Sequence, residues 1–79
     1  MTTSITVQNN IRECEKLSEF LDKFADSNTL PDETRGDMRL IIEELFTNIV
    51  RYAYDTDTVE EITVQFDKTP HAINITFTD

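Results

Sequence analysis

The chain has few of the residues that build flexible loops, cross-links or basic surfaces. Its 79 residues include one glycine, two prolines, one cysteine and no tryptophan, and 16 acidic residues outnumber seven basic ones. A net charge of −9 without a basic patch argues against direct binding of nucleic acid, whose phosphates require lysine and arginine. The single Cys14 cannot form an internal disulfide, and we interpret it as a small core residue, not a reactive thiol.

Long apolar runs are missing as well. No run approaches the roughly 20 residues of a membrane-spanning helix, and the N-terminal region has neither the basic start nor the apolar core of a signal peptide. We therefore expect a cytoplasmic protein with no membrane partner. A chain of this length buries only about 60% of its unfolded surface, so we expect one domain, residues 1–79, with a thin core.

The hydrophobic pattern predicts an α+β domain with the order strand, helix, helix, strand, strand. Asn10 and Glu13 resemble a capping box at the start of the first helix, and Pro31 suits the first turn of the second. The period then changes from that of a helix to strict alternation. The predicted ranges are a strand over 4–8, helices over 10–26 and 31–54, and strands over 62–66 and 73–77 joined by a hairpin loop over 67–71.

The second helix organises the rest of the chain. Its apolar residues recur at three- and four-residue steps and predict one broad buried face: Met38, Ile41, Ile42, Leu45, Phe46, Ile49, Val50 and Ala53. Glu44 and Asn48, one turn apart, fall side by side where this face meets solvent. A carboxylate and a carboxamide in that position can point into a cleft.

The stretch Leu40–Tyr54 resembles the N-box helix of the GHKL (Bergerat-fold, histidine-kinase-like) ATPases. Its pattern Glu-x-x-Thr-Asn, followed by a basic residue, an aromatic residue and Ala, is similar to the branch of bacterial anti-sigma factors that are also serine-protein kinases. One departure is Tyr52, which stands where relatives often have His. The resemblance implies a two-layer sandwich with helices on one face of a mixed sheet.

It also implies roles for particular residues. Asn48 would supply its side-chain oxygen to a Mg²⁺ ion that bridges the ATP phosphates, and such an ion needs only one or two protein oxygens. Glu44 would be the general base that takes the proton from a seryl hydroxyl as it attacks the γ-phosphate. The implied partners are a sigma factor and the anti-sigma-antagonist protein that carries the serine.

The end of the chain carries a second, partial match. The alternating stretch Ile73–Asp79 resembles the strand that leads into the Asp-x-Gly-x-Gly box of this family, whose Asp accepts the adenine amino group. Asp79 would be that adenine-binding residue. The glycines of the box and the glycine-rich lid do not occur in these 79 residues, so we expect the chain to represent the N-terminal half of such a domain and to be inactive alone.

Each of these residues also has a structural interpretation. Glu44 and Asn48 could form a solvated helix face, Arg51 could pair with a carboxylate of its own helix instead of a phosphate, and Asp79 could be a frayed end. The alternative function is a non-catalytic acidic module that binds a sigma factor or dimerises, and a third is ATP binding without transfer. We also expect self-association through the last two strands, because uncovered strand edges recruit other strands.

Overall fold

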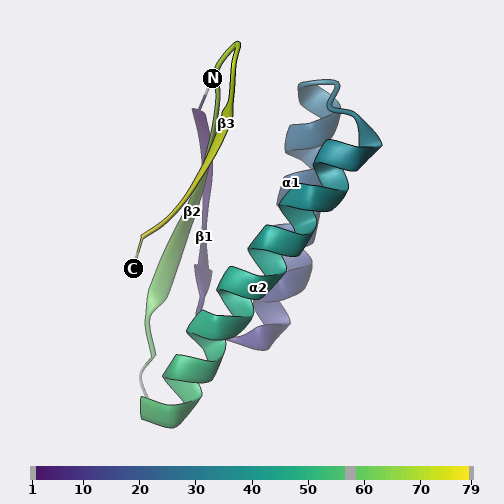
Figure 1. Ribbon diagram of the computed structural model, residues 1–79. Helices are drawn as coiled ribbons and strands as arrows, with labels where there is room; N and C mark the ends of the chain where they lie inside the picture. Colours follow the sequence, from purple (N-terminus) through teal and green to yellow (C-terminus); the bar gives the residue numbers. More distant parts are fainter. Residues whose placement is uncertain (1, 57–58, 79) are drawn as a thin grey trace.

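In the computed structural model of the chain, residues 2–56 and 59–78 are described, with the backbone alone at 54–56. The elements follow the predicted order, and the α+β class is confirmed (Figure 1). They are β1 (Thr2–Gln8), the 3-10 helix η1 (Ile11–Glu13), α1 (Cys14–Ser27), α2 (Asp32–Thr56), β2 (Glu61–Lys68) and β3 (Ile73–Thr78). Both helices lie on one face of the sheet (Figure 1). No helix in the described ranges is long and apolar enough to cross a membrane.

The sheet has the order β1-β2-β3, and both pairings are antiparallel. β1 pairs with β2 from Thr2↔Asp67 to Gln8↔Glu61 without interruption. The resemblance implies a mixed sheet, whereas the strands in the described residues pair only in antiparallel fashion. Since side chains alternate along a strand, this register gathers the apolar residues on the face that meets the helices and leaves most polar residues on the outer face, with Thr3 as an exception.

The start of the first helical segment uses both residues of the predicted capping box, but not reciprocally. The Asn10 Oδ1 atom accepts a hydrogen bond from the Arg12 backbone N–H at 2.9 Å. The Glu13 carboxylate accepts from the Gln8 backbone N–H at 3.2 Å, two residues before the cap, so it ties the helix start to the end of β1. Lys16 and the Gln8 N–H both stabilise this carboxylate, which lowers the pKa of Glu13 below its ordinary value.

The end of α1 is closed by a Schellman motif. The Leu30 N–H donates to the Ala25 carbonyl at 3.0 Å, and the Thr29 N–H donates to the Asp26 carbonyl at 3.3 Å. This motif places Thr29 at a φ of 51°, in the left-handed region that favours glycine. A β-branched residue therefore occupies the one non-glycine position with positive φ among the described residues.

The core lies between the helices and the inner face of the sheet, and its largest fully buried side chains are Phe46, Phe66, Leu21, Ile62 and Val64. On α2 the structure buries Met38, Ile42, Phe46 and Ala53, as predicted. The prediction that Ile41 and Leu45 are buried is wrong, because their side chains are 45% and 43% exposed. They lie on the flank of α2 that faces the hollows beside β3, where no described element covers them.

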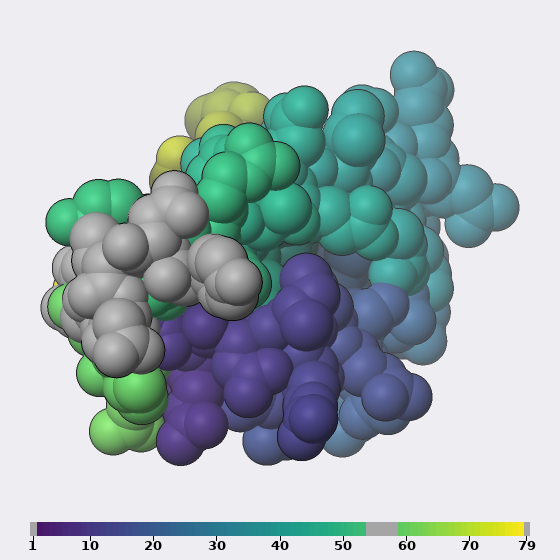
Figure 2. Space-filling view, turned by 90° about the horizontal axis from the view of Figure 1, so that it is seen from below, coloured from purple at the N-terminus to yellow at the C-terminus, as the bar shows by residue number. Residues whose placement is uncertain are grey.

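A polar cluster joins the two helices on their solvent side. Arg39 of α2 donates to the Asp22 carboxylate at 2.7 Å and to the Ser18 hydroxyl. Arg35, one turn earlier, donates to Asp22 at 3.3 Å and to Asp26 at 2.5 Å. The three acceptors recur at four-residue steps on α1, and the two arginines lie four residues apart on α2. The cluster therefore fixes the position of one helix along the axis of the other. Figure 2 shows α1, in purple to blue, in contact with α2, in teal.

Candidate functional site

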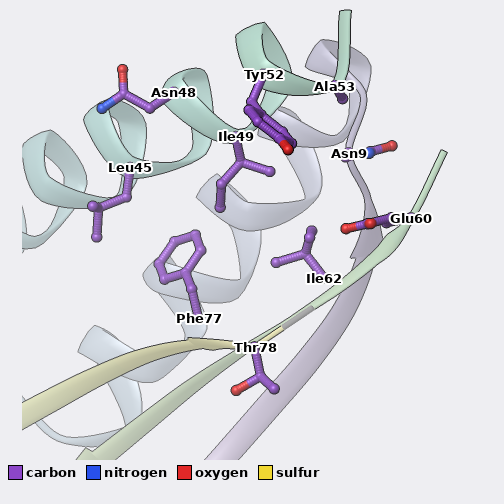
Figure 3. A pocket seen from close by; sticks show the side chains of 10 residues that line it. All are labelled: Asn9, Leu45, Asn48, Ile49, Tyr52, Ala53, Glu60, Ile62, Phe77 and Thr78. Carbon is purple, nitrogen blue, oxygen red and sulfur yellow. The ribbon is translucent and has the colours of Figure 1, made fainter. Parts of the chain in front are cut away.

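A large hollow lies between the C-terminal half of α2 and the strands β2 and β3. Its volume is about 490 Å³, within the range of small-molecule pockets. Apolar residues form most of its lining and polar residues its ends: Leu45, Ile49, Ala53, Ile62 and Phe77, with Asn9, Asn48, Tyr52, Glu60 and Thr78. In Figure 3 the side chains of Leu45, Ile49 and Phe77 converge on the space between α2 and β3.

Asn48 lies at the rim of this hollow. Its side chain is exposed and points away from the apolar floor formed by Ile49 and Phe77 (Figure 3). Asn48 also lines a second, more polar hollow of about 440 Å³ on the solvent side of α2. A carboxamide at the junction of two hollows can reach a ligand that extends from the apolar floor toward solvent.

Glu44 lies one turn before Asn48, and its side chain is exposed. It lines the solvent-side hollow together with Asn48 and Arg51, but it does not line the apolar hollow beside β3. The structure thus brings Glu44, Asn48 and Arg51 together on one surface of α2. Glu43, next to Glu44, is exposed as expected and reaches the same surface.

Two further sequence predictions concern Asp79 and Cys14. Asp79, the predicted adenine-binding residue, lies outside the described residues. Cys14 is half-buried at a small hollow between the helices. Burial, and to a smaller extent the Glu43 carboxylate, raises the pKa of its thiol, so the unreactive neutral form is favoured at neutral pH.

Three lining residues of the apolar hollow were not predicted from sequence: Asn9, Tyr52 and Glu60. They come from the segment after β1, from α2 and from the segment before β2, and they lie at one end of the hollow (Figure 3). The Asn9 N–H donates to the Glu60 carbonyl at 3.1 Å, which holds the two segments together. No motif marks this grouping, because it arises from the β1–β2 pairing and not from spacing along the chain.

The hollow can accommodate the parts of a nucleotide with magnesium. Its apolar floor suits a planar base, and Asn48 offers one neutral oxygen at the rim, the type of ligand that Mg²⁺ accepts beside phosphates and water. Within the described residues no three His, Cys, Asp or Glu side chains gather into a potential metal cluster. At the rim of the hollow, Asn48 could offer its side-chain oxygen to such an ion.

The chain is a two-layer α+β domain in which a long helix and a sheet border a hollow of small-molecule size. A profile of the family described as "Histidine kinase-like ATPase domain" matches residues 7–79, which is nearly the whole chain. The chain belongs to this family, and its elements are those of a partial Bergerat fold. ATP and Mg²⁺ are the typical ligands of such domains. No characterised protein and no solved structure gave a match.

Proposed function

We propose that the chain is the N-terminal portion of an anti-sigma regulatory factor with ATP-dependent serine-protein kinase activity. The complete activity transfers the γ-phosphate of ATP to a serine of an anti-sigma-antagonist protein, and a sigma factor is the second protein partner. The observation that carries the proposal is the grouping of Glu44, Asn48 and Arg51 on one surface of α2, next to an apolar hollow, in a chain of this ATPase family.

The resemblance supplies the proposed roles, and the positions of Asn48 and Glu44 are compatible with them. Asn48 would hold a Mg²⁺ ion at the junction of the two hollows, and such an ion would supply neutralisation of the phosphate charge. Glu44, on the solvent side, accepts the proton of a seryl hydroxyl that approaches from outside the hollow, while the new oxygen–phosphorus bond forms and the bond to ADP breaks. By the resemblance, Asp79 would accept a hydrogen bond from the adenine amino group.

One observation favours the alternative, a non-catalytic module that binds a partner protein. Glu44 does not line the hollow beside β3, and an exposed carboxylate on a helix is most often a solvated side chain. The third possibility is ATP binding without phosphate transfer, in which Asn48 would bind the magnesium ion and Glu44 would not serve as a base.

Experiments on a hybrid protein would distinguish these three candidate functions. In the hybrid, residues 1–79 are followed by the glycine-rich half of another histidine kinase-like ATPase domain. Asn48→Ala should abolish magnesium-dependent ATP binding in calorimetry, because the ion loses its protein ligand. Glu44→Ala should retain ATP binding and lower phosphate transfer to the antagonist serine by about 10²–10⁴, the typical contribution of a general base.

The matched control is Glu33→Ala, which removes an exposed carboxylate in the first turn of α2 that lines neither hollow. It should change neither binding nor transfer. Equal loss of affinity in the Asn48 and Glu44 variants would contradict their separate roles. ATP binding with no transfer in the unmutated hybrid, when a serine-bearing antagonist is present, would favour the alternatives.

A further inference from the structure

The inner face of the sheet changes from apolar to polar at one end. Ile62 of β2 points inward and is 1% exposed, and Val7 of β1 lies opposite to it. Two residues further along, the Asn9 N–H donates to the Glu60 carbonyl at 3.1 Å, which continues the pairing by one more cross-strand row. Since side chains alternate along a strand, Asn9 and Glu60 have the same inward orientation as Val7 and Ile62. A carboxylate thus turns toward the helix layer.

The Glu60 side chain belongs to the large hollow beside β3. It lines this hollow together with Asn9 and Tyr52, and Figure 3 shows its carboxylate turned toward Ile62. Its neighbour Glu61 points to the outer face of the sheet, is exposed and does not line the hollow. From the other described residues the Glu60 carboxylate accepts no hydrogen bond. Its oxygens are therefore available to a ligand in the hollow.

The two ends of the hollow differ in charge. Of the described residues that line it, Glu60 is the only charged one. Asn48, at the rim, also borders the solvent-side hollow together with the guanidinium of Arg51. Figure 3 shows Asn48 and Glu60 at opposite ends of the lining. Because a carboxylate repels phosphates and a guanidinium attracts them, a nucleotide should lie with its phosphates toward Asn48 and its base toward Glu60.

The chemistry of a carboxylate restricts which base fits this end. An ionised carboxylate accepts hydrogen bonds and donates none. It therefore pairs with an exocyclic amino group, as acidic residues do with the amino group of cytosine in DNA, and it repels a keto oxygen in the same place. The amino group of adenine carries two hydrogens. By the resemblance, Asp79 would take one of them, and the second would be available to Glu60.

We propose that Glu60 is a specificity-determining residue of the nucleotide site, whose carboxylate accepts a hydrogen bond from the amino group at position 6 of a purine. The site then prefers adenine to guanine and hypoxanthine, which carry a keto oxygen at that position. This inference rests on the proposed function only in that the hollow holds a nucleotide. It requires neither phosphate transfer nor a role for Glu44.

Nucleosides test this contact without phosphates, magnesium or an acceptor protein. Titration of the 79-residue chain with millimolar adenosine, followed by backbone amide chemical shifts, should perturb the amides of Glu60 and Ile62. Purine riboside is the same nucleoside without the amino group. Its dissociation constant should be about threefold to tenfold higher than that of adenosine, the effect of one hydrogen bond. Equal dissociation constants, or no adenosine-dependent shifts at these amides, would overturn the proposal.

Two adjacent glutamates provide a matched pair of variants. Glu60→Ala removes the inward carboxylate but keeps the backbone carbonyl that Asn9 contacts. It should reduce the preference for adenosine over purine riboside by about threefold to tenfold and should not weaken the binding of purine riboside. Glu61→Ala removes the carboxylate of the outer face and should change neither affinity. If Glu60→Ala weakens both nucleosides equally, or if Glu61→Ala has the same effect, Glu60 does not read the amino group.

A third nucleoside separates the base from the sugar. Acidic residues also bind ribose hydroxyls in other nucleotide sites, so 2′-deoxyadenosine is the necessary comparison. Glu60→Ala should leave the affinity ratio of adenosine to 2′-deoxyadenosine unchanged. A change in this ratio, with an unchanged preference for adenosine over purine riboside, would assign Glu60 to the ribose and overturn the proposal. Phosphate transfer in the hybrid is measured separately, so its absence would contradict the kinase function and leave the result for Glu60 intact.

Discussion

Replacing Thr29 by glycine should stabilise the protein. Thr29 has a φ of 51°, and the left-handed region costs an L-residue roughly 1–2 kcal/mol relative to glycine. Its side chain is exposed, so the substitution removes no buried apolar contact. Glycine makes the unfolded chain more flexible, which opposes the gain by about 0.4–1 kcal/mol. The backbone term is larger, and we expect a net increase of about 0.5–1 kcal/mol in the free energy of unfolding.

Urea denaturation at constant protein concentration would measure this gain, which corresponds to a rise of several degrees in Tm for a domain of this size. Gly36→Ala is the control with the opposite substitution. Gly36 lies in α2 with no positive φ, and an added Cβ would meet nothing within 4 Å, so alanine should stabilise there by roughly 1 kcal/mol. If Thr29→Gly lowers the stability while Gly36→Ala raises it, the assigned strain at Thr29 is refuted.

Two further predictions concern pH and nucleotide. The pKa of Glu13 is lowered in the folded state, so its carboxylate stabilises the fold above its ordinary pKa of 4.5, and this contribution disappears as the pH falls through the lowered value. Glu13→Gln should therefore lower the stability at pH 7 but hardly at pH 3, and an equal difference at both values would exclude this linkage. The 79 residues alone should bind ATP more weakly than ~1 mM, because their single glycine, Gly36, lies within a helix and cannot form a phosphate-binding loop. Calorimetric titration tests this, and sub-millimolar affinity would contradict it.

The elements of the fold could be predicted from sequence because each depends on local periodicity. The change from a helical period to strict alternation near residue 60 separated α2 from β2, and Asn10 marked the first helix start within a residue. What periodicity cannot report is which neighbour covers a given apolar residue. Ile41 and Leu45 have the spacing of buried residues, yet they are exposed because no described element packs over them.

The candidate site, too, could be predicted only in part from the sequence. Glu44 and Asn48 could be selected from sequence through their match to the family's Glu-x-x-Thr-Asn pattern, and the four-residue step on a helix predicts that they lie side by side. Their distribution between two hollows depends on how α2 is rotated over the sheet, which the core residues determine. The arginine cluster with Asp22 was not predicted either, because its partners come from two helices with no pairing rule between them.

The pairing of β1 with β2 has a consequence for how the chain acquires its structure. Residues of β1 meet partners 53 to 65 positions later, from Gln8↔Glu61 to Thr2↔Asp67. During synthesis from the N-terminus, both helices leave the ribosome before the strand that completes their support exists. The helical hairpin can form early through near-neighbour contacts, whereas the sheet must wait for β2 and for closure of a long loop. The nascent chain therefore passes through a stage in which the apolar faces of α1 and α2 have no sheet to cover them, and at this stage chaperone binding or misassociation competes with folding.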